Sequence, residues 1–146
     1  MSLLLEFEAV MSNDVHADVL FDLLAQREYS ISHKSMPDIL IHREFVKNHP
    51  YRFWYLIKCK EKYIGTVYLT FENHISISIP VSHYEKMNDI LEWTMHVHEP
   101  LSESKSIRPA SFQMNVSLED IHLAKVLDNL GHKKIQVTYA ITNNQS

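Results

Sequence analysis

Glycine is nearly absent from this chain of 146 residues, which contains only Gly65 and Gly131. Loops that cradle a phosphate are normally rich in glycine, because their backbone must bend sharply and come close to the ligand. The scarcity of glycine therefore excludes most phosphate-binding chemistry of the glycine-loop kind.

Cysteine is also scarce, and long apolar runs and basic clusters are missing. The single cysteine, Cys59, excludes an intramolecular disulfide and fits a reducing, cytoplasmic location. No apolar run approaches the roughly 18 residues of a membrane span, and the apolar start at residues 1–10 lacks the basic residues of a signal peptide. A net charge of −4, without a Lys/Arg cluster, gives no general affinity for nucleic acid. We therefore expect neither nucleic acid nor a membrane among the partners.

The length is enough for one domain with one core, so residues 1–146 are expected to form a single domain. Hydrophobic periodicity predicts elements in the order β-α-α-β-β-β-α-β-α-β. The expected strands are 3–10, 52–60, 63–71, 75–79, 111–116 and 134–141, and the expected helices are 15–28, 38–48, 82–98 and 118–130. This order predicts an α/β (α+β) fold with a mixed central sheet, in which an antiparallel meander is followed by β-α-β crossovers that place 111–116 parallel to 75–79.

Several polar residues and one glycine predict where the helices begin and end. Asn13 or Asp14 could cap the first helix, and Pro37 suits the first turn of the second. Ser117 with Asp120 three residues later resembles a capping box at the last helix. Gly131 suits the left-handed position that follows the end of that helix.

The segment ISISIPVSHYEKMNDILEWTM, residues 75–95, runs from an alternating strand directly into a helix. Such a junction is where many α/β proteins bind a phosphate on the free N–H groups of the helix start. This junction contains no glycine, and it carries Glu85 and Asp89. Like charges at about 4 Å cost on the order of 1 to 4 kcal/mol even when partly screened, so two acids here oppose a bound diphosphate.

Two segments resemble the GNAT superfamily of acetyl-CoA-dependent N-acetyltransferases. LAKVLDNLGHKKIQVTYAI is similar to the family's ending, in which a helix closes on a leucine-glycine-aromatic turn before the last strand. HPYRFWYLIKCKEKYIGTVYLTFENHISISI is similar to its three-strand meander, and looks most like members associated with bacterial surface-sugar biosynthesis. The resemblance implies a GNAT-like sheet with helices on both faces, acetyl-CoA or coenzyme A as cofactor, and an amine acceptor such as an amino sugar. By the same analogy, a homodimer could join through the last strands.

The resemblance also implies where the cofactor would bind. The family's Q/R-x-x-G-x-G/A loop falls near residues 84–89, with its glycine positions at about Glu85 and Met87. Pro80 lacks an N–H in a region where family members use strand amides to hold the pantetheine arm. A rebuilt site would use the following residues: Ile79, Val81, Ser82, His83, Lys86 and Asn115.

Catalytic residues are weakly marked. The tyrosine that family members often place four residues before the conserved glycine corresponds to Leu127, which cannot donate a proton, and His132 stands where an aromatic residue is preferred. A base could come from Glu72 or His74, or be a chain of waters. Tyr139 and Tyr84 are the remaining phenols, although their spacing places neither in a site.

Other conspicuous side chains favour structural roles. The aromatic residues Trp54, Tyr55, Tyr63 and Tyr68 are typical of core and cross-strand pairs more than of an acceptor pocket. His96 and His98 are two apart on a helix and point in different directions, so no metal site is expected. Cys59 is expected to be a buried thiol and not a nucleophile. The loop 32–38, the loop 48–52 and Arg52 in it are candidates for the acceptor side.

The sequence leaves two functions open. One is an N-acyltransferase in which an amine attacks an acetyl thioester, with catalysis by positioning and by oxyanion stabilisation from a strand N–H. The other is a catalytically inactive GNAT-fold protein that binds a ligand or serves in an assembly, because a fold does not fix a function.

Overall fold

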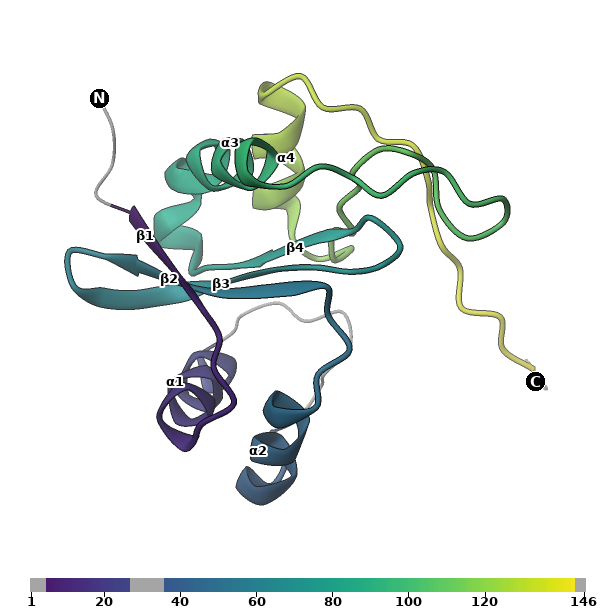
Figure 1. The fold of residues 1–146 in the computed structure, drawn as a ribbon. Coiled ribbons are helices and arrows are strands. Elements are labelled where there is room, and N and C mark those ends of the chain that lie inside the picture. Colours follow the sequence, from purple (N-terminus) through teal and green to yellow (C-terminus); the bar gives the residue numbers. More distant parts are fainter. Residues whose placement is uncertain (1–4, 27–35, 144–146) are drawn as a thin grey trace.

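A computed structural model of the chain describes residues 5–26 and 36–143 (Figure 1). The elements, in chain order, are β1 Leu5–Ala9, α1 Asp14–Ala25, α2 Ile39–Lys47, β2 Phe53–Cys59, β3 Lys62–Leu69, β4 Ile75–Ser78, the 3-10 helix η1 Val81–Lys86, α3 Met87–Val97 and α4 Ile121–Asn129. Among the described residues, no helix has both the length and the apolar character that crossing a bilayer requires.

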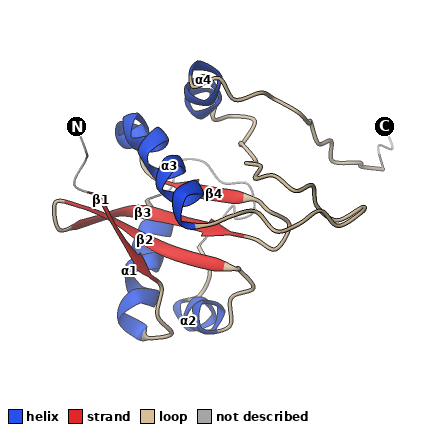
Figure 2. Ribbon diagram, turned by 45° about the horizontal axis from the view of Figure 1, so that its top comes forward, coloured by secondary structure: helices blue, strands red, loops and turns tan. Residues whose placement is uncertain are grey.

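The four strands form one antiparallel sheet in the order β1-β2-β3-β4. Helices α1 and α2 lie against one face, and α3 and α4 lie on the other (Figures 1 and 2). Because successive strand residues point to opposite faces, neighbours in β2 belong to different cores. Leu56 packs with Ala17, Leu20 and Val46 on the α1/α2 side, while Ile57 belongs to the larger cluster under α3 and α4.

Short polar side chains begin two helices, the first of them as expected. Pro37, expected in the first turn of the second helix, instead precedes its capping residue. Asn13 caps α1 by accepting the His16 N–H at 2.8 Å, which confirms one of the two predicted caps. Asp38 caps α2 by accepting the Leu40 N–H at 2.8 Å. An ion pair between Arg43 and Asp18, 3.0 Å apart, then links α2 to α1.

Asn73 fastens the β3–β4 turn to the long connection that follows α3. It has a positive φ of 67° and is fully buried. Its side-chain amide donates to the carbonyls of Leu101 and Pro109 at 2.9 and 2.8 Å, and its Oδ1 accepts the Leu101 N–H at 2.8 Å. The connection therefore reaches the edge of the sheet at a fixed position.

Two predicted strands are absent from the described structure. Segment 111–116 has only one bridge, a parallel one between Gln113 and His74, and it then diverges from β4. Segment 134–141 forms no strand and is exposed throughout. Both sequences have strand composition, but a strand needs a partner edge, and neither finds a complete one here.

The predicted ends of the later helices are partly wrong. The expected helix 82–98 is divided into η1 and α3, because the chain winds tightly after Pro80 before it relaxes into an α-helix. The expected capping box does not form: Ser117 donates to Glu119, and Asp120 itself caps α4 by accepting the Leu123 N–H at 3.0 Å. Gly131, at φ 89°, follows α4 as predicted, with the His132 N–H donating to the Leu127 carbonyl at 3.0 Å.

Candidate functional site

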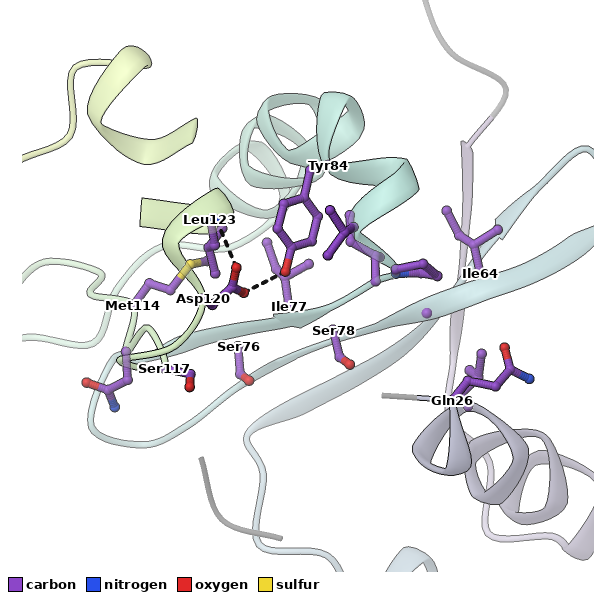
Figure 3. Close-up of a pocket in the computed structure, with 16 residues that line it drawn as sticks. Gln26, Ile64, Ser76, Ile77, Ser78, Tyr84, Met114, Ser117, Asp120 and Leu123 are labelled. Carbon is purple, nitrogen blue, oxygen red and sulfur yellow. Dashed lines mark hydrogen bonds between the residues drawn. The ribbon is translucent and has the colours of Figure 1, made fainter. Parts of the chain in front are cut away.

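A small cavity of about 80 Å³ lies where the sheet opens between β4 and residues 114–117 (Figure 3). Its floor is β4 with Gly65 of β3, one wall is η1 and the start of α4, and Leu23 and Gln26 at the end of α1 approach it from the other face of the sheet. The polar groups around it are Gln26, Ser76, Ser78, Asn115, Ser117 and Asp120. The site is therefore a polar-rimmed slot at the edge of the sheet.

The backbone of β4 points hydrogen-bonding groups into this slot. The Ile75 N–H donates to the Gln113 carbonyl at 2.7 Å, so the backbone N–H of Ile75 points away from β3. Backbone direction alternates along an antiparallel strand, so Ile77, and Ile79 just beyond the strand, face the same way. Beyond the Gln113 bridge, residues 114–117 no longer pair with β4. The amides of Ile77 and Ile79 are therefore available to a ligand.

The same alternation changes the significance of Pro80. Position 78 pairs with Thr66 of β3, and position 80 continues that side of the strand. The donor that proline lacks would therefore point toward β3 and away from the slot. Pro80 itself lines the slot, and the expectation that it weakens the binding edge stays a prediction.

Tyr84 and Asp120 meet across the slot. The Tyr84 hydroxyl donates to Asp120 Oδ2 at 2.6 Å, while Asp120 Oδ1 accepts the Leu123 N–H (Figure 3). Asp120 is only 4% exposed, so its carboxyl group depends on these partners. This hydrogen bond joins η1 to the first turn of α4 and closes the slot on that side.

A second, open hollow of about 400 Å³ lies on the far side of Tyr84. It is bounded by η1 and α3 on one flank and by α4 on the other, through Glu85, Asn88, Val126, Asn129 and Leu130. Tyr84 lines both this hollow and the slot.

Residues 84–89, where the resemblance places the diphosphate loop, form the end of η1 and the start of α3. Met87, at one expected glycine position, has no exposed surface and is part of the core, and its N–H already donates to the Tyr84 carbonyl. Glu85, at the other position, is on the surface and pairs with Lys86 at 2.7 Å. The hydrogen bond from Lys86 lowers the pKa of Glu85, so the carboxylate keeps its negative charge. Lys86 also contacts His83 Nδ1 at 3.0 Å, so its ammonium group is already engaged.

The structure separates the candidate cofactor residues into two groups. Ile79, Val81 and Asn115 line the slot. The other three, Ser82, His83 and Lys86, belong to η1 and are not part of its lining.

The candidate catalytic residues lie away from the slot lining. Glu72 and His74 belong to the β3–β4 turn, and Tyr139 is in the exposed segment after α4. Leu127 packs against the core under α3 and α4.

Sequence reasoning missed the role of Asp120, which it treated as half of a capping box, and could not place Tyr84. A sequence signal existed for Ser76 and Ser78, which alternate with isoleucines in β4 and whose hydroxyl groups point toward the α1 side (Figure 3). No spacing rule brings together η1 and α4, which are more than thirty residues apart in the sequence. Only the packing of the two elements shows the contact.

The aromatic residues of the meander pack as structural pairs. Trp54 donates to the Thr66 hydroxyl at 3.2 Å, Tyr63 donates to Glu8 at 2.7 Å, and Tyr68 stacks on Tyr51. Tyr55 lies 2.7 Å from His98 Nε2 beneath the end of α3, where burial raises the pKa of Tyr55 and lowers that of His98.

The remaining conspicuous residues form no cluster that suggests chemistry. Arg52 donates to the Glu99 carbonyl at 2.9 Å, and Cys59 packs beside the core. Within residues 5–26 and 36–143, no three His, Cys, Asp or Glu side chains gather as a metal site would require. Most of the loop 32–38 lies outside the described residues.

No protein-family model matches the chain, and no curated protein sequence matches it. Several solved structures, however, share its fold. A possible acetyltransferase from Clostridium difficile 630 is 12% identical, with a TM-score of 0.58 over 97% of this chain and 99% of that one. The aminoglycoside N-acetyltransferase AAC(6')-Iy in complex with CoA is 10% identical, with a TM-score of 0.59 over 99% and 98%. A ribosomal-protein-alanine N-acetyltransferase from Brucella melitensis biovar Abortus 2308 is 9% identical, with a TM-score of 0.58 over 95% and 99%. The chain therefore has the GNAT fold, as its sequence predicts.

Proposed function

We propose that this protein is an N-acyltransferase that uses an acetyl-CoA-type thioester and an amine acceptor, and that the slot beside β4 is its reaction site. The observation that carries the proposal is the pair of unpaired strand amides, at Ile77 and Ile79, which face a gap in the sheet. Structural neighbours that cover nearly the whole chain include acetyltransferases, one of them in complex with CoA, and this supports the proposal.

The residues fit one end of such a cofactor and not the other. A pantetheine arm carries amides and a thioester, which suit a strand edge with free N–H groups and the nearby Asn115 side chain. The diphosphate end meets Glu85, a buried Met87 and a helix start that is already hydrogen-bonded. Ser82, His83 and Lys86 remain our candidates for that end, although Lys86 would have to leave Glu85 to serve it.

In this proposal coenzyme A supplies the activated acyl group, and the protein supplies positions and hydrogen bonds. A strand N–H aimed at the slot would stabilise the developing oxyanion, an effect that is typically worth a factor of about 10² to 10³ for each donor. Tyr84 is the phenol that the slot contains, and it could deliver a proton if its bond to Asp120 were exchanged. Glu72, His74 and Tyr139 remain predictions from the sequence.

The acceptor and the location rest on the sequence. The resemblance to proteins of bacterial surface-sugar biosynthesis suggests an amino-sugar acceptor, and the hydroxyl groups of Ser76 and Ser78 with the Gln26 amide offer hydrogen bonds to a polar molecule at the rim. A cytoplasmic location remains a prediction from the single cysteine.

A second candidate function is ligand binding or assembly without catalysis. The size of the slot favours it, because about 80 Å³ is well below the roughly 300 to 1,000 Å³ of typical small-molecule sites. The Tyr84–Asp120 hydrogen bond favours it as well, since it engages the phenol that catalysis would need for proton delivery. On this alternative the protein retains the GNAT sheet but no longer binds coenzyme A.

Calorimetric titration with three probes distinguishes these functions. Acetyl-pantetheine carries the arm and its thioester without a nucleotide. Coenzyme A carries the arm and the nucleotide diphosphate but no acetyl group, and acetyl-CoA carries the arm, the thioester and the diphosphate. If the slot binds the arm and the diphosphate gains nothing, acetyl-pantetheine and acetyl-CoA should bind with similar affinity. Absence of binding by all three probes up to millimolar concentration would refute the acyltransferase proposal and leave the non-catalytic one.

A further inference from the structure

The slot holds only the reactive end of an acyl donor, so the surface outside it decides which donor fits. Its volume of about 80 Å³ is well below the space that a whole small-molecule ligand occupies. Tyr84 borders the slot and also the open hollow of about 400 Å³ between η1, α3 and α4 (Figure 3). Residues 84–89, where the resemblance places the diphosphate, line that hollow through Tyr84, Glu85 and Asn88. The hollow therefore bears on what the far end of the donor can be.

The charge presented at this hollow is negative. Among the described residues that line it, Glu85 is the charged one. The side chain of Glu85 is 63% exposed, whereas the side chain of its partner Lys86 is only 12% exposed. The covered ammonium group lies 2.7 Å from Glu85 Oε1 and 3.0 Å from His83 Nδ1. A diphosphate would meet the exposed carboxylate before the lysine, and Asp89, exposed in the first turn of α3, adds a second negative charge.

The backbone of the same region is already committed to the turn that joins η1 to α3. The His83 N–H donates to the Pro80 carbonyl at 2.8 Å, and the Met87 N–H donates to the Tyr84 carbonyl. Met87 has no exposed surface, so its side chain anchors the turn in the core. The backbone could open toward a diphosphate only by withdrawing that side chain from close packing. Neither the charges nor the amides therefore favour a nucleotide diphosphate.

We propose that the acyl donor of this site is a thioester on a pantetheine arm that carries no nucleotide diphosphate. This inference rests on the N-acyltransferase function proposed above and specifies its donor. The N–H groups of Ile77 and Ile79 would donate to the carbonyls of the arm. The remaining lining of the hollow, which includes Asn88, Asn129 and Val126, is uncharged and suits a neutral arm better than an anion.

The acyl transfer itself does not need the nucleotide. The amine nitrogen bonds to the acyl carbon, the C–S bond breaks, and the proton that the nitrogen loses ends on the sulfur of the released thiol. A pantetheine arm of this kind can be a free small molecule or can be attached to a carrier protein. Both sources share the chemistry that the slot would recognise, which is the thioester and the amides of the arm.

The test is calorimetric titration of the full chain with acetyl-pantetheine and with acetyl-CoA, at low and at physiological salt. Repulsion between exposed charges is strongest at low salt, so acetyl-CoA should there bind about fivefold more weakly than acetyl-pantetheine. At physiological salt the two affinities should approach each other, because the repulsion is screened.

A pair of matched variants assigns the repulsion to Glu85. Glu85→Gln keeps the shape of the side chain and removes its charge, so at low salt it should strengthen acetyl-CoA binding about fivefold and leave acetyl-pantetheine binding unchanged. Glu103→Gln makes the same change of charge at an exposed position in the connection after α3, outside the lining of both the slot and the hollow. It should leave the ratio of the two affinities unchanged.

The outcomes separate this inference from the function on which it rests. Acetyl-CoA binding about tenfold or more tighter than acetyl-pantetheine would overturn the inference and leave the N-acyltransferase proposal standing. Equal shifts of the affinity ratio in Glu85→Gln and Glu103→Gln would overturn it as well. Absence of binding by both donors up to millimolar concentration would refute the acyltransferase proposal and the inference together.

An acetylated carrier protein, used as a third probe, distinguishes the two sources of the arm. Binding tighter than that of free acetyl-pantetheine would assign the arm to a carrier protein. Equal or weaker binding would assign it to the free small molecule. Both results support a donor without the nucleotide, because neither probe carries one.

Discussion

Tyr84→Phe should destabilise the protein, because it removes one oxygen atom and leaves the buried carboxyl of Asp120 short of a partner. The hydroxyl donates to Asp120 Oδ2 at 2.6 Å, and the remaining Asp120 bond is with the Leu123 N–H at 3.0 Å. Hydrogen bonds to charged groups contribute about 1.5 to 3 kcal/mol, so the free energy of unfolding should fall by about that amount. For a chain of this size each kcal/mol corresponds to roughly 2 to 4 °C in Tm, which predicts a fall of roughly 3 to 12 °C.

The assay is thermal or urea unfolding, with Tyr139→Phe as the matched control. That control makes the same chemical change at an exposed phenol and should alter the unfolding free energy by about 0.5 kcal/mol or less. Adding Asp120→Asn completes a double-mutant cycle that measures the coupling between the two side chains. A Tyr84→Phe effect no larger than that of the control, or a coupling near zero, would refute the view that this bond holds η1 against α4.

Three further predictions concern two glycines, Asn73 and two half-buried histidines. Gly65→Ala should lower the free energy of unfolding by about 3 kcal/mol or more, since its Cβ would clash with the Ser78 carbonyl oxygen. Gly131→Ala has nothing within 4 Å but sits at φ 89°, so it should lower the free energy of unfolding by about 1 to 2 kcal/mol. Urea unfolding compares the two variants, and equal losses would contradict the clash. Asn73→Ala should cost roughly 3 kcal/mol or more through three lost hydrogen bonds at a positive φ. Asn73→Asp should not recover it, because a carboxylate can accept the Leu101 N–H but cannot donate to the two carbonyls. An effect of Asn73→Ala below about 1 kcal/mol in urea unfolding would refute its fastening role. Burial lowers the pKa of His49 and His98 below the ordinary 6.5, so the unfolded chain binds more protons than the folded one. The stability that these residues contribute should be full above about pH 6.5 and decline as the pH falls below it. The double variant His49→Gln with His98→Gln should flatten that decline, and an unchanged slope of Tm against pH would show that other groups cause it.

The local pattern of the sequence was sufficient for the three-strand meander of the sheet. Alternation of apolar residues in β2, β3 and β4, and the short KEK and ENH turns between them, predict a meander whose pairing needs no distant information. The cap at Asn13 was predictable for the same reason, because it acts on an amide three residues away, whereas the equally local cap at Asp38 was not predicted. The final glycine also acts locally, so the helix end at Gly131 was predictable.

Predictions from local sequence were wrong where an element depends on contact with a distant segment of the chain. Segments 111–116 and 134–141 have strand composition, but composition does not supply an edge. The boundary between η1 and α3 was missed because the hydrophobic positions of 82–98 suit a continuous helix. Ser117 matched a capping motif, yet the chain turns at Asp120, whose carboxyl reaches both Leu123 and Tyr84.

The role of the candidate cofactor residues stays a prediction, although the structure places three of them at the slot. Ile79, Val81 and Asn115 were identified through the family resemblance, and they line the slot. The consequence of each departure from the family pattern required the structure. Met87 is a core residue, so a glycine there would open a buried void instead of a phosphate site, whereas Glu85 is on the surface and can be changed freely.

The sequence by itself determined the order of the helices and of the first four strands, the faces of the meander strands and the absence of glycine from residues 75–95, because these depend on residues close together in the chain. Only the tertiary structure decided which amides of β4 face the slot, that Tyr84 and Asp120 close it, and that the last strand-like segment lies without a partner. Those properties depend on which distant segments meet. The direction of a backbone hydrogen bond, and the burial of a side chain, are fixed only by what packs against them.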